Sequence, residues 1–250
     1  MNARGQAYYA GTSGLVLPVP NKLSYPPEFQ DQPRLVYYAA LFNSIEINSS
    51  FYKIPQAATL RKWADLVPSH FRFTFKLWKG ITHEKGLQYA PADLDRFINA
   101  INAVGAKKGA LLVQFPPSVR EGQFLQINNL LNEVRNAAPD WDVAVEFRHP
   151  SLYADRTDQL LTGLNMSLVI HDLPASASPQ EPLNLPFVYL RFHGPNGGYR
   201  GSYDDAFLNE QAHNIREWME ASKRVYVYFN NTMGAAVDNL GVLNGEVGAY

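Results

Sequence analysis

Eight short apolar or aromatic segments recur along the chain, and helix-like patterns separate most of them. The segments cover residues 7–14, 44–52, 71–78, 109–117, 142–150, 166–173, 187–195 and 224–232. The helical patterns cover residues 32–42, 56–67, 91–104, 121–138, 153–163, 204–222 and 233–240. Strands that alternate with helices favour a parallel sheet, and eight such units in 250 residues are typical of a (β/α)8 barrel. We therefore predict an α/β fold, a single (β/α)8 TIM barrel over residues 1–250.

The connection after the sixth segment differs from the others, because PASASPQEPLNLP (174–186) contains four prolines. We expect it to lack a full helix. The alternative fold is an open doubly wound sheet, which predicts a glycine-rich phosphate turn after its first strand. The first segment instead ends in Gly11-Thr12-Ser13-Gly14, which lacks that fingerprint. The barrel is therefore the better prediction.

Composition limits the function classes. The net charge of −1 gives no general attraction to nucleic acid or to an anionic membrane, so nucleic acid is possible as a partner but not indicated. The absence of cysteine excludes disulfides and thiol nucleophiles. The first residues, MNARGQAYYAGTSG, contain no apolar signal region, and no apolar run is long enough to span a membrane. We expect a cytoplasmic protein; its oligomeric state stays open.

Polar residues occupy regular positions at the ends of the strand-like segments. In SIEINSSFYKIP (44–55), Glu46 and Asn48 alternate with Ile45 and Ile47. The same alternation places Thr74, Lys76, Gln114, Glu146, Arg148, Arg191, His193, Tyr228 and Asn230 on one face of their strands. In a barrel, one face of each strand packs on the helices and the other points to the axis. These residues should therefore surround the carboxyl-terminal mouth, where (β/α)8 enzymes place their sites.

Several longer motifs carry a resemblance to a known family. They are GTSG (11–14), FNSIEINSSFYKIP (42–55), FRFTFK (71–76) with Trp63, ITH (81–83), LLVQFPP (111–117), AVEFRHPS (144–151), HD (171–172), YLRFHG (189–194) and VYVYFNNTMGAAVDNL (225–240). On these motifs the chain resembles the YecE-like family, domain of unknown function family 72. The resemblance implies a (β/α)8 fold and supplies no established reaction. One departure is Leu15-Val16-Leu17-Pro18, where the family usually has an aromatic residue after the glycine turn.

The mouth residues suggest acid–base chemistry on an anion. Glu46 and Glu146 lie on the second and fifth strands, so they could face each other as general acid and base if their pKa values differ, with His193 or Asp172 assisting. Arginine forks suit phosphate or carboxylate, and amides suit hydroxyl groups. The predicted substrate-binding residues are Asn48, Lys76, His83, Gln114, Arg148, His171, Arg191, Gly194, Asn230 and Asn231.

Two further features could complete such a pocket. The glycine-rich segment HGPNGGYRGSY (193–203), with Asn231 or Thr232 before the last helix, could bind an anion through backbone N–H groups. Tyr52, Trp78, Phe115 and Tyr199 could form a stacking wall, although ordinary core packing is the better explanation for each of them.

We therefore predict an enzyme acting on a small anionic substrate, such as a phosphorylated sugar or a nucleotide-like compound. No cofactor is predicted, but a divalent metal is possible, because Glu46, Glu146, Asp172, His171 and His193 are potential ligands of a metal-dependent hydrolase or isomerase. No HxH or HExxH spacing is present, and the nearby cations would repel a metal. The same ring of polar residues would also suit a non-catalytic nucleotide- or metabolite-binding module, or a barrel sealed by ion pairs.

Overall fold

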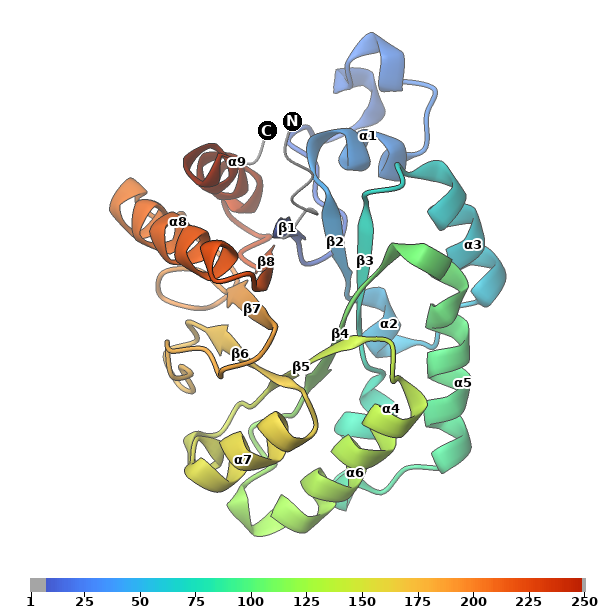
Figure 1. The fold of residues 1–250 in the computed structure, drawn as a ribbon. Coiled ribbons are helices and arrows are strands. Elements are labelled where there is room, and N and C mark those ends of the chain that lie inside the picture. The colour runs from blue at the N-terminus through green and yellow to red at the C-terminus, as the bar shows by residue number, and fades with distance from the viewer. Residues whose placement is uncertain (1–7, 249–250) are drawn as a thin grey trace.

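The computed structural model describes residues 8–248, and its centre is one sheet of eight parallel strands. Neighbouring strands follow the order β1-β8-β7-β6-β5-β4-β3-β2 (Figure 1). Their bounds are Tyr8–Thr12 (β1), Ser44–Ile47 (β2), Arg72–Lys76 (β3), Lys108–Gln114 (β4), Asp142–Glu146 (β5), Ser167–His171 (β6), Phe187–Phe192 (β7) and Arg224–Phe229 (β8). The predicted (β/α)8 architecture is confirmed.

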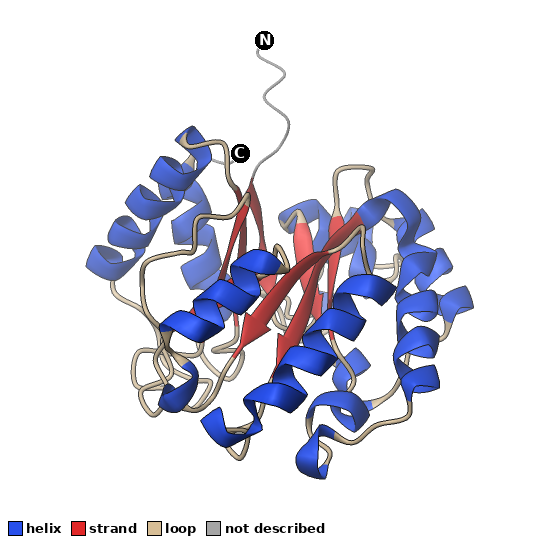
Figure 2. Cartoon of the chain, turned by 60° about the horizontal axis from the view of Figure 1, so that its bottom comes forward, coloured by secondary structure: helices blue, strands red, loops and turns tan. Residues whose placement is uncertain are grey.

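Helices surround the strands (Figure 2). The longer ones are Arg34–Leu41 (α1), Ala57–Leu66 (α3), Pro91–Ile101 (α5), Phe124–Ala137 (α6), Asp155–Gly163 (α7), Asp205–Glu220 (α8) and Ala236–Val247 (α9). Single turns are Ser49–Tyr52 (α2) and Lys79–Thr82 (α4), and short 3-10 turns are Lys22–Ser24, Pro27–Phe29, Lys85–Leu87, Asn102–Lys107, Glu121–Gln123 and Pro150–Leu152. As expected, no helix connects β6 to β7.

The barrel closes between β1 and β2 through few backbone contacts. An isolated bridge joins Ser13 to Glu46, and the Gly14 N–H donates to the Glu46 carbonyl at 2.8 Å. Tyr38 of α1 bridges part of the seam, because its hydroxyl accepts from the Thr12 N–H at 2.8 Å and lies 3.1 Å from the Ser44 carbonyl, to which it can donate. The Asn43 side chain bridges another part, since it accepts from the Ala10 N–H at 2.8 Å and donates to the Tyr8 carbonyl at 2.9 Å. The barrel is thus nearly closed, and two side chains complete the backbone hydrogen bonding of its seam.

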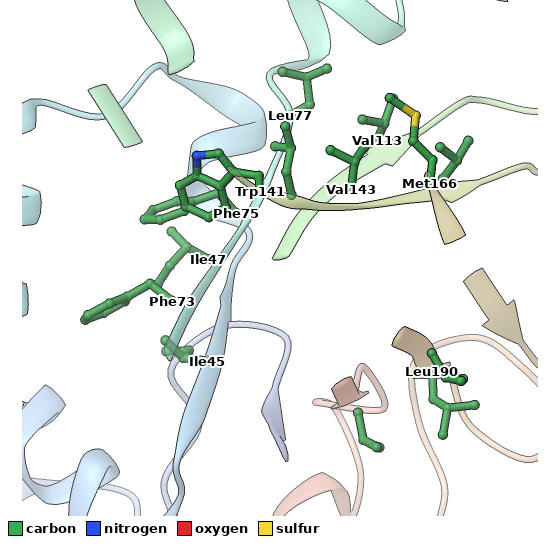
Figure 3. Close-up of a cluster of buried hydrophobic side chains, with 14 of the residues drawn as sticks. Ile45, Ile47, Phe73, Phe75, Leu77, Val113, Trp141, Val143, Met166 and Leu190 are labelled. Atoms are coloured by element: carbon green, nitrogen blue, oxygen red, sulfur yellow. The ribbon is translucent and has the colours of Figure 1, made fainter. Parts of the chain in front are cut away.

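The alternation predicted from the sequence separates two apolar regions. Ile45, Ile47, Phe73 and Phe75 point outward with Val113 and Val143 into the layer between strands and helices (Figure 3). A smaller cluster fills the barrel axis, formed by Tyr9, Ala110, Leu112, Ala144, Val169, Phe187, Tyr189, Tyr226 and Tyr228. Glu46, Glu146 and Arg191 share the parity of the axial residues, so the strands carry them into the barrel interior.

Most predicted strands extend too far at their carboxyl ends. The clearest case is residues 49–52, which form the helical turn α2 and not the end of β2. The Ser50 hydroxyl lies 2.6 Å from the Ile47 carbonyl and 2.7 Å from the Lys76 carbonyl, which ties this turn to the end of β3. The last helix also begins later and runs further than the predicted 233–240. Within residues 8–248, no helix combines the length and apolar character needed to cross a membrane.

Candidate functional site

A cavity of about 370 Å³ opens where the strands end. Six of the predicted substrate-binding residues line it: Asn48, Lys76, Gln114, Arg148, Arg191 and Asn230. Phe51 and Tyr52 of α2, Pro117, and Tyr199 of the glycine-rich segment form the rest of its lining. The cavity therefore has charged and amide groups from the strand ends and an aromatic wall from the connections.

Arg191 forms the floor of this cavity, together with two carboxylates that have no exposed surface. Its Nε and Nη2 donate to Glu46 at 3.1 and 2.8 Å, and its Nη1 donates to Glu146 at 2.7 Å. The Nη2 group also reaches the Ser13 hydroxyl at 3.3 Å, and Nη1 reaches His193 Nε2 at 3.3 Å. These contacts use all five N–H groups of the guanidinium. Arg191 can offer a ligand its charge but no free hydrogen bond.

The two glutamates do not face each other across an open space, because Arg191 lies between them. Burial by itself would raise the pKa of Glu46, but Arg191 and hydrogen bonds from Ser13 and Tyr189 hold that pKa below its usual value. Burial is likewise outweighed at Glu146, where Arg148 and Arg191 hold the pKa well below the usual range. Both pKa values are therefore shifted in the same direction, downward. Neither carboxylate holds a proton at neutral pH that it could donate as a general acid.

His193 links this floor to Asp172. The backbone N–H of His193 donates to Asp172 Oδ1 at 2.8 Å, and its ring Nδ1 lies 3.2 Å from the same oxygen. Burial lowers the pKa of His193 to about 4, although the hydrogen bond to Asp172 opposes this. In the neutral ring these partners assign the proton to Nδ1 and leave Nε2 as the acceptor for Arg148, at 3.2 Å, and for Arg191. His193 thus positions both arginines.

Arg148 has N–H groups that are not hydrogen-bonded within the described chain. Its Nε donates to Glu146, and its Nη2 contacts His193. Among residues 8–248 no acceptor meets its other three N–H groups, and 11% of its side chain is exposed at the cavity. Arg148 is therefore the arginine that can bind an anion directly.

Lys76 is the third cation of the cavity. Its Nζ lies 4.1 Å from the centre of the Phe51 ring, and no carboxylate of the described chain comes within 4.0 Å of it. Burial, together with the charges of Arg191 and Arg148, lowers the pKa of Lys76 to about 8, although Glu146 and Glu46 oppose the shift. Lys76 is therefore mainly a cation at pH 7, but it loses its proton at a lower pH than an ordinary lysine.

Comparison with known proteins identifies the family. Residues 9–249 match the family model described as "Protein of unknown function DUF72". The chain belongs to this family. It is 28% identical to the UPF0759 protein YunF of Bacillus subtilis, over 86% of each chain. It also resembles solved DUF72 proteins from Enterococcus faecalis (TM-score 0.80, 22% identity, 97% of this chain and 96% of the other) and Thermotoga maritima (TM-score 0.74, 24% identity, 97% and 100%).

Four predicted binding residues of this DUF72 chain do not line the cavity: His83, His171, Gly194 and Asn231. The His83 ring packs edge-on against Phe51 at 4.8 Å, behind the aromatic wall. His171 Nε2 lies 3.1 Å from the Phe147 carbonyl. The Asn231 side chain donates to the Gly201 carbonyl at 3.0 Å. These residues support the mouth without contributing to its surface.

The glycine-rich segment of the DUF72 chain binds three of its own backbone amides. The Gly194 N–H donates to the Tyr203 hydroxyl at 2.6 Å, the Gly197 N–H to the Gly194 carbonyl at 2.7 Å, and the Tyr199 N–H to the His193 carbonyl at 2.9 Å. These amides are engaged within the segment and are not free to bind phosphate. Gly194 is required by the backbone, since its φ is +103° and a Cβ would lie 2.1 Å from the Arg200 carbonyl oxygen.

Of the four aromatic residues predicted as a wall, Tyr52 and Tyr199 line the cavity. Phe115 is buried and stacks on Phe147 at 5.5 Å, and Trp78 packs against the outer core. Sequence analysis overlooked Phe51 and Pro117, and also the two hydroxyl groups that bind Glu46, those of Ser13 and Tyr189. Tyr189 could have been found, because it shares strand parity with Arg191. The others depend on tertiary contacts.

The barrel mouth has two parts: a layer of ion-paired side chains that fills the barrel, and the open cavity above this layer. The Glu46–Arg191–Glu146 triad is an ion-paired plug, as expected for a sealed barrel, but the cavity lies above this triad. Across residues 8–248, no three His, Asp or Glu side chains are grouped so that they could hold a metal ion. The carboxylates nearest the cavity are bound to arginine instead.

Proposed function

We propose that the cavity binds a small anionic substrate, such as a phosphorylated sugar or a nucleotide-like compound, and that the protein is an enzyme acting on it. The observation that carries this proposal is the unbalanced positive charge of the cavity. Lys76 has no carboxylate partner in the described chain, and Arg148 keeps free N–H groups. An anion between them would satisfy both.

The remaining lining residues suit a polar, hydroxylated or aromatic substrate. Asn48 Oδ1 is buried without a hydrogen-bond partner in the described chain, so a ligand hydroxyl would satisfy it. Gln114 and Asn230 supply further amide groups, while Tyr52 and Tyr199 present partly exposed rings. The residues that position the arginines in this proposal are Glu46, Glu146, His193 and Asp172. Lys76, in their place, is the group that transfers protons to or from the substrate.

The test is a thermal-shift and calorimetric titration with inorganic phosphate, sugar phosphates, nucleotides and divalent metals. A ligand at about 100 times its Kd adds about 2.7 kcal/mol, which raises the midpoint of a chain of this size by roughly 5–10 °C. Arg148→Gln should lose most of the rise, because it removes the free donors and leaves Glu146 paired with Arg191. The matched control is Arg156→Gln, which alters an arginine paired with Glu121 at the surface.

A rise with phosphorylated compounds that Arg148→Gln abolishes supports the proposal. No rise with any anion, or a rise that Arg148→Gln leaves unchanged, overturns the anion site. A rise with metal alone favours a metal-dependent hydrolase or isomerase. Prolonged incubation of each bound compound, followed by phosphorus NMR, separates an enzyme from a binding module, since a module returns its ligand intact.

A further inference from the structure

Lys76 differs from other lysines of the described chain in what surrounds its ammonium group. Lys107 donates to the carbonyl of Val67 at 2.5 Å, and Lys108 lies 3.7 Å from Asp140. Lys79 is exposed near Tyr52. Lys76 instead ends β3, points into the cavity and contacts the face of Phe51. Within residues 8–248, no group stabilises its charged form by a hydrogen bond.

Burial is the main factor that favours the neutral amine of Lys76, and the charged groups facing it act in both directions. Arg191 from β7 and Arg148 after β5 repel a proton on it, and Glu146 and Glu46 attract one but are already bound to arginine. His83, on the other side of Phe51, stays neutral because burial and nearby cations, including Lys76, lower its pKa to about 4. A lysine that is desolvated beside other cations is the usual form of an amine nucleophile.

We propose that Lys76 is the nucleophile of this cavity and forms a Schiff base with the carbonyl group of a small anionic aldehyde or ketone. This inference rests on the proposed anion site and narrows its substrate class to anionic carbonyl compounds. Arg148 would hold the phosphate or carboxylate of the substrate, and the cavity of about 370 Å³ would place the carbonyl near Nζ.

The covalent step balances without any oxidant or reductant. The neutral Lys76 amine attacks the carbonyl carbon and forms a C–N bond, and the carbonyl π electrons move to oxygen, which takes up a proton as nitrogen releases one. The resulting carbinolamine accepts a further proton from solvent on its oxygen and loses water, so that a protonated C=N bond remains. This iminium withdraws electrons from the adjacent carbon and would assist cleavage or proton removal there.

The experiment traps the iminium by reduction. The full chain is incubated with glyoxylate, an anionic aldehyde, and sodium cyanoborohydride, whose hydride converts the imine to a stable secondary amine. Peptide mapping by mass spectrometry then locates the carboxymethyl label. We expect labelling of Lys76 at pH 7.5 to be at least about tenfold faster than labelling of Lys79, because the lowered pKa of Lys76 makes its neutral amine more abundant. The Lys76 rate should level off as the pH passes about 8.

Matched variants separate the two proposals. Lys76→Arg keeps the cation but cannot form the imine, so it should bind phosphate and lose the label, whereas Lys79→Met should keep the label. Inorganic phosphate should slow labelling of Lys76 by competing at Arg148. Uniform labelling of all exposed lysines with Lys76 no faster would overturn the nucleophile. If phosphate binding persists in that case, the anion site stands; if phosphate also fails to bind, both proposals fall.

Discussion

At Arg191 a single positive charge is shared by two carboxylates, Glu46 and Glu146, neither of which has exposed surface. Burial of three charged groups is stable only because each is paired and hydrogen-bonded. Together with Arg148, which also binds Glu146, this arrangement provides two cations for two anions. Lys76 adds a third cation, and this excess charge makes the mouth receptive to an anionic ligand.

We expect Arg191→Met to lower the free energy of unfolding by about 3–5 kcal/mol at pH 7, because it leaves the buried Glu46 without a cation and removes one of the two cations bound to Glu146. Urea unfolding followed by circular dichroism measures the change. Arg148→Met is the control and should cost clearly less, since Glu146 keeps its bond to Arg191. Equal losses in the two variants, or a loss below about 1 kcal/mol for Arg191→Met, would contradict the central role given to Arg191.

Strand parity could predict which residues line most of the cavity. It could not predict how deeply each side chain is buried or which of its hydrogen-bonding groups stay free. Parity placed Glu46, Glu146 and Arg191 on the axis, where the structure has them. It could not indicate that every N–H group of Arg191 is hydrogen-bonded to a neighbouring side chain, whereas Arg148 keeps free N–H groups. That difference depends on the side-chain geometry of several strands at once, which no local pattern encodes.

Among the elements, the seam between β1 and β2 is the weakest part of the barrel. Gly11 faces the Ser44 carbonyl so closely that a Cβ at residue 11 would lie 2.0 Å from its oxygen and 2.8 Å from the Tyr38 hydroxyl. Only a residue without a side chain allows β1 to approach β2 and Tyr38 to bridge them. The glycine is therefore required by the closure of the barrel.

We expect Gly11→Ala to lower the free energy of unfolding by about 3 kcal/mol, the upper end of the usual cost of overpacking, since backbone must move. Gly163→Ala, at the end of α7, is the control: a Cβ there has no neighbour within 4 Å, and alanine should be neutral or slightly stabilising in the helix. Differential scanning calorimetry compares the two. A melting temperature for Gly11→Ala equal to that of the parent chain would refute the close approach.

Element types were predictable over most of the described chain, and the errors have a common cause. Residues 49–52 look like a continuing strand because they end in two aromatic residues, Phe51 and Tyr52, yet the Ser50 hydroxyl binds a carbonyl of β3 and the chain turns into α2. The proline-rich connection from β6 to β7 was correctly expected to lack a helix, because proline acts locally. Local signals were reliable, and signals that depend on a distant partner were not.

For the whole molecule, the buried titratable groups predict instability in acid. His193 has a pKa of about 4 in the fold and an ordinary value of 6.5, so between these pH values only the unfolded chain binds its proton. Stability should therefore fall as pH drops from about 6.5, by about 1.4 kcal/mol per pH unit for this group. Glu46 and Glu146, whose pKa values are lowered, add a second loss as pH falls below about 4.5.

Urea unfolding at several pH values between 7 and 4 measures this profile. His193→Gln should make the free energy of unfolding fall less steeply between pH 6.5 and 4.5. The steeper fall below pH 4.5 should remain, because the glutamates cause it. If the free energy of unfolding of the unmutated chain stayed constant from pH 7 to 5, this would contradict a neutral, buried His193.

The division of the cavity between strands and connections has a consequence for evolution and engineering. Its ionic floor is built on β2, β5 and β7, whereas its rim of aromatic and proline side chains comes from α2, Pro117 and the segment that carries Tyr199. Surface connections tolerate substitution far better than the strands they join. A library confined to Phe51, Tyr52, Pro117 and Tyr199 could therefore retune which molecules are accepted while leaving the reactive amine and its arginine neighbours in place.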